Sequence, residues 1–96
     1  MLGIYLLTQN ENTGWDTYDS AVVIAENEDD AKTIHPSNYM NYFIEDGDWY
    51  FETKTGRKCK HHSQDWTLSE HVKVEFIGKP KRGLERGVVC ASFNAG

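Results

Sequence analysis

The sequence lacks long apolar segments and has only two cysteines. Its apolar runs, such as Ile4–Leu7 and Ala21–Ala25, fall far short of the roughly 20 residues that cross a bilayer. The first ten residues carry no basic group and become polar after the first seven, which is unlike a signal peptide. Cys59 and Cys90 are too few for a secreted disulfide scaffold. We therefore expect a cytoplasmic protein with free thiols and no membrane association.

Catalytic motifs are absent as well. The segment 78–83 contains glycines and lysines, but it lacks the P-loop spacing and the Ser or Thr after the Lys. Asp16 and Asp19 stand close together without the glycine-centred loop and twelfth-position Glu of an EF-hand. No nucleophile, base and orienting group occur at a plausible spacing. We therefore expect a protein that is not an enzyme.

The segment 59–62, Cys-Lys-His-His, is the one cluster that looks like a metal site. Cys59 and His61 would share a strand face, and Cys90 or His71 could add a ligand. Four ligands at a recognisable spacing are nevertheless missing. We interpret the segment as a surface hairpin and expect neither a metal nor a cofactor.

With 96 residues, the chain is long enough for one domain, because a second would have no core of its own. Val, Ile, Leu and Phe number 20, close to the proportion at which disorder becomes the default. Eight Trp and Tyr residues raise the large apolar set to 28. We therefore expect a single folded domain over residues 1–96.

Apolar patterning predicts strands near both ends of the chain. Residues 3–10 begin apolar on both alternating faces, which favours a central strand covered on both sides. Residues 20–25 are continuously apolar, residues 72–76 alternate, and residues 88–93 form a closing strand. Residues 10–19 are dense in turn formers and are predicted to be a loop.

One short helix and one hairpin are predicted between these strands. Asn27 resembles an N-cap, and Pro36 stops a helix of about 28–35, with His35 as a helix-end cation. The segments 49–53 and 57–62 are predicted to form a hairpin around Gly56. Residues 37–48 show no clear period and stay unassigned. The order β-β-α, hairpin, β-β predicts an α+β fold, a mostly antiparallel sheet with one short helix packed on a face.

The formal charge of −5 is unevenly distributed. Residues 1–53 hold one base and eleven acids, and residues 54–96 hold nine bases and four acids, which gives −10 and +5. A protein that is acidic overall is not expected to bind nucleic acid non-specifically. Eight of the ten bases lie in two runs: Lys54, Arg57, Lys58 and Lys60, then Lys79, Lys81, Arg82 and Arg86.

The two basic runs have two interpretations. Turns are solvated and often charged, so the runs could simply be exposed loops. The alternative is a local anion site, because screening over about 10 Å lets a patch act despite the global charge. Cations bind phosphate and aromatic rings stack on bases, which suits a nucleotide-type ligand. The candidate ligand-binding residues are Asn10, Trp15, Tyr18, Arg57, Lys58, Lys79, Lys81, Arg82, Arg86, Phe93 and Asn94.

Two further tryptophans are weighed as stacking candidates. Trp49 stands beside Tyr50 and Phe51 in a predicted strand, so we expect it in the core. Trp66 lies in a predicted loop and stays a candidate for stacking.

Three segments, Ile4–Asn10, Tyr18–Val23 and Ala91–Gly96, resemble a family of small, uncharacterised proteins of phages and prophages, about 90 residues long. The predicted strand at 72–78 is also similar, whereas residues 37–65 are not. The family has no established activity, so the resemblance implies only a context. Small acidic phage proteins without catalytic motifs are often accessory proteins that block host defence.

We predict a non-enzymatic phage counter-defence protein that sequesters a nucleotide-type anionic small molecule in the host cytoplasm. A domain this small has difficulty enclosing a ligand alone, so we expect a homo-oligomer. The alternative is a direct inhibitor of a host defence protein that docks through its acidic N-terminal half. That alternative requires the acids to share one face, yet they are scattered along the chain.

Overall fold

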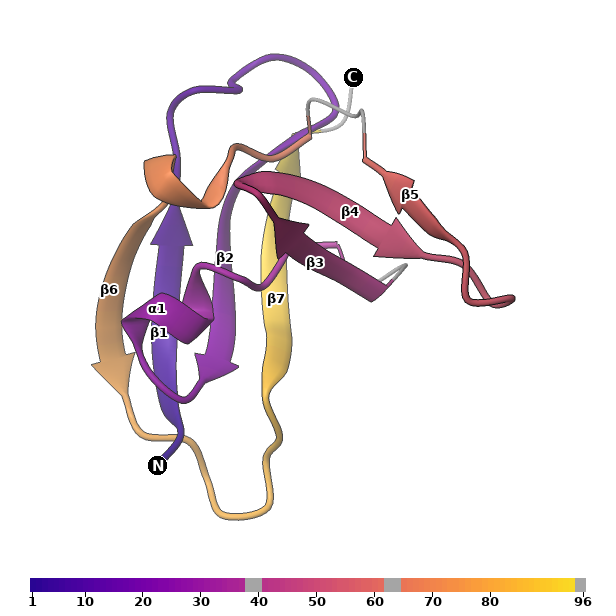
Figure 1. Ribbon diagram of the computed structural model, residues 1–96. Coiled ribbons are helices and arrows are strands. Elements are labelled where there is room, and N and C mark those ends of the chain that lie inside the picture. The colour runs from indigo at the N-terminus through magenta and orange to yellow at the C-terminus, as the bar shows by residue number, and fades with distance from the viewer. Residues whose placement is uncertain (38–40, 62–64, 95–96) are drawn as a thin grey trace.

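The computed structural model describes residues 1–37, 41–61 and 65–94, which form two antiparallel sheets with one short helix (Figure 1). The larger sheet has the strand order β6-β1-β2-β7 and the smaller one β3-β4-β5. The predicted α+β class is confirmed. The elements are β1 (Gly3–Thr8), β2 (Thr17–Ala25), α1 (Glu28–Ala31), β3 (Asn41–Glu45), β4 (Asp48–Glu52), β5 (Lys58–Lys60), a 3-10 turn (Ser69–His71), β6 (Lys73–Gly78) and β7 (Gly87–Asn94).

The core lies on one face of the larger sheet. Tyr5 pairs with Val23 and Leu7 with Ala21, so these buried side chains form one layer. The helix and the smaller sheet lie over this face (Figure 1). On the opposite face, Ile4, Leu6 and Val22 are half-buried, whereas Ile24 is buried. β1 is a central strand as predicted, but its side chains on this second face are only half-buried, so the prediction that it is covered on both sides is wrong.

The helix begins where predicted and ends early. The Asn27 side chain accepts a hydrogen bond from the Asp30 backbone N–H at 2.8 Å, so the predicted N-cap is confirmed. The predicted end near residue 35 is wrong. The hydroxyl of Thr33 donates to the Asp30 carbonyl at 2.6 Å, and the backbone N–H of Ile34 turns to Ala31. A side chain that competes for a helix carbonyl in this way shortens the helix to a single turn.

The unassigned segment 37–48 contains a strand that sequence patterning did not reveal. β3 pairs with β4 through the two-residue turn Asp46-Gly47, whose φ angles are 52° and 81°. Positive φ at both turn residues is the geometry that Asp-Gly favours in hairpins. The second hairpin, β4–β5, is confirmed, with Gly56 at a φ of 84°. Parts of the predicted segments, residues 38–40 and 62, lie outside the described residues.

No helix among the described residues is both long enough and apolar enough to cross a membrane.

Gly47→Ala should lower the free energy of unfolding by about 1–2 kcal/mol, because an alanine resists the positive φ of this turn. Gly14→Ala is the control, since a Cβ there meets nothing within 4 Å and the backbone is not in the left-handed region. Urea denaturation of both variants measures the difference. Equal stability of the two variants would contradict the turn geometry.

Candidate functional site

The segment Asp65-Trp66-Thr67 connects the smaller sheet, the larger sheet and the loop between β1 and β2. Its three consecutive carbonyls each accept a hydrogen bond from a different part of the chain. The donors are the Tyr18 backbone N–H to Asp65 at 2.8 Å, the Asn12 side-chain amide to Trp66 at 2.9 Å, and the Trp49 indole N–H to Thr67 at 2.9 Å. We call residues 65–67 the connecting segment.

The side chain of Asp65 extends this connection into a cluster with two histidines. One carboxylate oxygen lies 3.1 Å from His61 Nε2 and 3.4 Å from His35 Nε2. The His35 ring stacks on Tyr42 at a centroid distance of 4.1 Å and meets Trp49 edge-on at 5.1 Å. With 3% of its surface exposed, His35 belongs to the core between the two sheets.

The protonation states follow from these contacts. The Ser37 backbone N–H donates to His35 Nδ1 at 3.0 Å, so the neutral ring carries its proton on Nε2, toward Asp65. Burial lowers the pKa of His35, although Asp65 partly opposes this. Burial also opposes ionisation of Asp65, but its interactions with the two histidine rings outweigh burial and lower the pKa of that carboxyl. At neutral pH, Asp65 is ionised and His35 is neutral.

The prediction that His35 is a helix-end cation is therefore wrong. The helix ends at Ala31, and the histidine lies among aromatic rings where a charge would be poorly solvated.

The cluster of His35, His61 and Asp65 was also tested as a metal site. Within the described ranges, its three ligand atoms lie within 4.8 Å of one another, and neither Cys59 nor Cys90 takes part. A histidine that binds metal through Nε2 normally donates its Nδ1–H to an acceptor. Here a backbone N–H already points at Nδ1 of His35, so the cluster fits a hydrogen-bonded connection better than a metal site.

Four of the predicted ligand-binding residues come together at one end of the larger sheet. The Asp16 backbone N–H donates to the Asn94 carbonyl at 2.6 Å, and the Asn94 amide donates to the Gly14 carbonyl at 3.0 Å. A bulge in β2 turns Tyr18 to the covered face, where its ring lies 4.8 Å from that of Phe93. We call Trp15, Tyr18, Phe93 and Asn94 the aromatic end.

Trp15 is the most exposed member of the aromatic end, with 72% of its surface open to solvent. The loop that carries it is tied to the end of β7 and, through Asn12, to the connecting segment. The Gln9 side chain adds hydrogen bonds to the backbone at Glu11, Asn12 and Tyr18. Asn10 lies exposed on the same loop.

The two basic runs do not meet. The run 54–60 lies at the outer turn of the smaller sheet, and the run 79–86 lies in the β6–β7 loop at the far end of the larger sheet (Figure 1). The aromatic end and the β6–β7 loop are separated by the length of β7, about 20 Å at the usual rise per residue. One chain alone does not assemble the predicted site.

Two of the predicted basic residues support the fold. The Arg86 guanidinium binds both carboxylate oxygens of Asp30 at 2.9–3.1 Å and the Thr33 hydroxyl at 3.0 Å. This contact lowers the pKa of Asp30. Lys58 forms an ion pair with Glu45, which raises the pKa of the lysine. The other predicted bases, Arg57, Lys79, Lys81 and Arg82, are exposed.

A cleft of about 420 Å³ lies beside the connecting segment and was not predicted from the sequence. Trp49 and Trp66 line it, although each is only 4% exposed. Trp49 is thus in the core as predicted, and Trp66 is also a core residue rather than an open stacking surface. On the rim, Lys60 is paired with Asp48, and Glu11 lies 3.9 Å from the His71 ring, so the cleft has no excess of positive charge for an anion. Its lining comes from five separate segments of the chain, so no local sequence pattern indicates the cleft.

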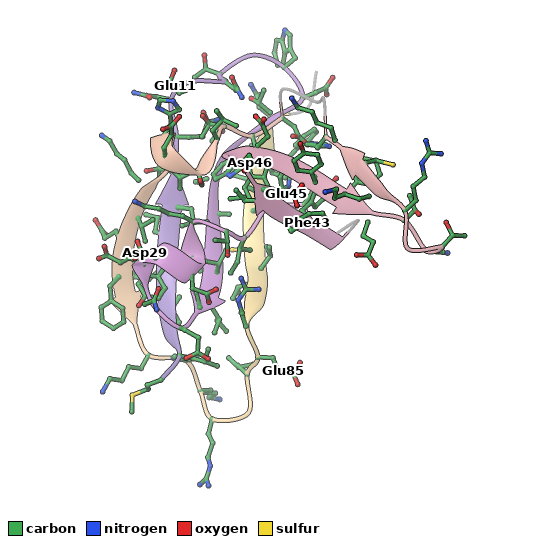
Figure 2. All side chains as sticks on the ribbon, in the orientation of Figure 1. Glu11, Asp29, Phe43, Glu45, Asp46 and Glu85 are labelled. Carbon is green, nitrogen blue, oxygen red and sulfur yellow. The ribbon has the colours of Figure 1, made fainter. Side chains whose placement is uncertain are left out.

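The acids do not form a single face. Figure 2 shows Glu11, Asp29, Glu45 and Glu85 on different parts of the molecule. Several others form ion pairs with bases of the same chain. This arrangement offers little support for docking through the acidic half.

Comparisons with protein-family models, with curated proteins and with solved structures found no match to this chain.

Acid should weaken the fold through His35. Because the pKa of this histidine is lowered in the folded state, the unfolded chain takes up a proton near its usual pKa of 6.5 that the folded chain resists. The free energy of unfolding should therefore fall between pH 7.5 and pH 5, by up to about 1.4 kcal/mol for each unit of pKa lowering. Asp65 contributes a further loss only below its usual pKa of 3.8.

Urea denaturation across this pH range tests the effect. His35→Gln should flatten the pH dependence, whatever its effect on stability at pH 7.5. His71→Gln is the control, because that side chain is about half exposed, and its profile should match the wild type. If the stability of His35→Gln depends on pH as steeply as that of the wild type, His35 is not the cause of the loss in acid.

Proposed function

We propose that the protein is a non-enzymatic binding protein that captures a nucleotide-type anionic small molecule, with the base held at the aromatic end. The observation that carries the proposal is the exposed Trp15 ring on a loop that is fixed at several points. An aromatic face held open to solvent can stack on a base. Because the loop is already ordered, binding requires little further loss of conformational entropy.

The groups beside Trp15 suit binding rather than bond breaking. Tyr18 and Phe93 contribute ring surface, and Asn94 contributes an amide whose donor is engaged with Gly14. Together they offer a surface for stacking, and we expect stoichiometric capture without turnover. In the phage setting that the sequence resemblance suggests, such capture would remove a signalling nucleotide of the host.

A thermal-shift screen against mono-, di- and cyclic nucleotides tests this function. A ligand present at 100 times its dissociation constant stabilises the fold by about 2.7 kcal/mol, which raises the melting temperature by roughly 10–20 °C in a domain of this size. Trp15→Ala should abolish the shift, because it removes the proposed stacking surface. It should not destabilise the free protein, since the ring is largely exposed.

Ile77→Ala is the matched control, an exposed apolar side chain on the opposite edge of the sheet, and it should keep the full shift. Two results together would overturn ligand capture: no shift across the whole panel, and binding of a host protein through the acidic residues. They would support direct inhibition of that host protein instead.

A further inference from the structure

The two free edges of the larger sheet differ in a way that points to a partner. β6 carries two charged residues, Lys73 and Glu75. Charges of this kind keep edge strands from pairing with other chains. Register irregularities occur at both edges, once between β6 and β1 and twice between β7 and β2, so the charge is what distinguishes them. β7 has eight residues with no charge and no proline, and residues 89–93 are all exposed. Among the described residues, β2 is the one strand that pairs with β7.

A second copy of this chain fits the free edge of β7. Any strand can pair antiparallel with its own copy across a twofold axis, which gives a closed and self-complementary contact. The absence of charge on β7 means that two copies meet without repulsion. Val89, 56% exposed, and Phe93, 46% exposed, would be partly covered by such pairing.

This pairing also joins the two halves of the predicted ligand site. With the twofold axis near Cys90 or Ala91, Asn94 of one copy is offset by no more than about two residues from Gly87 of the other. The two paired strands are about 4.8 Å apart. The aromatic end of each copy then lies beside the β6–β7 loop of its partner, which carries Lys79, Lys81, Arg82 and Arg86. Within one chain, the same groups are at opposite ends of β7.

The faces of the two copies agree with this arrangement. A twofold axis perpendicular to the sheet keeps the covered faces on the same side. Phe93 and Tyr18 lie on the covered face, and so does the helix whose Asp30 holds Arg86. Arg86 is held by Asp30, and Glu85 lies near the start of β7 (Figure 2), so the bases left to meet an anion are Lys79, Lys81 and Arg82.

We propose that the protein forms a twofold dimer by antiparallel pairing of β7 with β7. We further propose that each dimer has two anion sites, each built from the aromatic end of one copy and the basic β6–β7 loop of the other. The shared site rests on the proposed function, whereas the dimer does not.

The dimer is tested without any ligand. Light scattering after size exclusion should give twice the chain mass of 11.0 kDa. Val89→Lys should produce a folded monomer, because it places like charges across the twofold axis. Ile77→Lys makes the same change at a similarly exposed position on the β6 edge and should stay dimeric.

In a Cys59→Ser background, a short bis-maleimide should link two chains through Cys90. A wild-type monomer, or equal effects of the two lysine variants, would overturn the dimer.

The shared site is tested by mixing two variants. The probe is ADP labelled with a fluorescent N-methylanthraniloyl group. Trp15→Ala and Arg82→Glu should each abolish probe binding, and Lys32→Glu should not. After exchange of subunits, mixed dimers carry one intact site, so about one quarter of the wild-type binding capacity should return.

The outcomes separate the two proposals. Binding by wild type with no recovery on mixing would overturn the shared site and leave ligand capture standing. If the protein is a dimer but does not bind the probe, both the shared site for this ligand class and the proposed function would be overturned. The β7 dimer itself would stand.

Discussion

Three consecutive backbone carbonyls, those of Asp65, Trp66 and Thr67, determine how the parts of this protein are arranged. Each accepts a hydrogen bond from a different segment, namely β2, the β1–β2 loop and β4. A buried carbonyl without a donor is costly, so the connecting segment requires all three segments to be in place. The orientation of the smaller sheet and the position of the Trp15 loop thus depend on the same few bonds.

The composition explains why the connection between the sheets is polar and aromatic. The chain has few aliphatic residues, and among residues 1–37, 41–61 and 65–94 the largest fully buried side chains are Leu7 and Val23. Rings fill much of the remaining space between the sheets, and an ionised Asp65 beside two histidines orients them. A partly buried carboxylate is tolerated only when it is hydrogen-bonded, and His61 provides this bond at 3.1 Å while His35 Nε2 lies 3.4 Å away. This also makes the connection sensitive to protonation.

The sequence was informative where the pattern was local. The larger sheet, the Asn27 cap and the hairpin around Gly56 follow from alternation, capping and turn rules. The strand at Asn41–Glu45 was missed, although Asp46-Gly47 between aromatic residues is a strong hairpin signal. The helix end was misplaced because Thr33 competes for a carbonyl well before Pro36. In both places a local signal, the Asp46-Gly47 turn or the Thr33 hydroxyl, decided the structure, whereas apolar periodicity and Pro36 did not.

The candidate site was harder to predict because it is built from distant segments. Nothing local indicates that His35 meets Asp65, or that Asn94 meets Gly14. The fold does bring Trp15, Tyr18, Phe93 and Asn94 together at one end of the larger sheet. The basic runs lie elsewhere, because charge in the sequence does not show which end of a strand a loop occupies. A dimer through β7 would reconcile the two, since it places opposite ends of the same strand side by side.

The central claim is that the connecting segment holds the Trp15 loop and both sheets as one unit. Hydrogen exchange followed by NMR measures this most directly, at the Tyr18 amide and the Trp49 indole N–H that bind the segment. Both protons should exchange with the same free energy as the Val23 amide in the core, because they open only on global unfolding. Exchange of either proton at a much lower free energy than Val23 would show that the loop or the smaller sheet moves independently, which contradicts the claim.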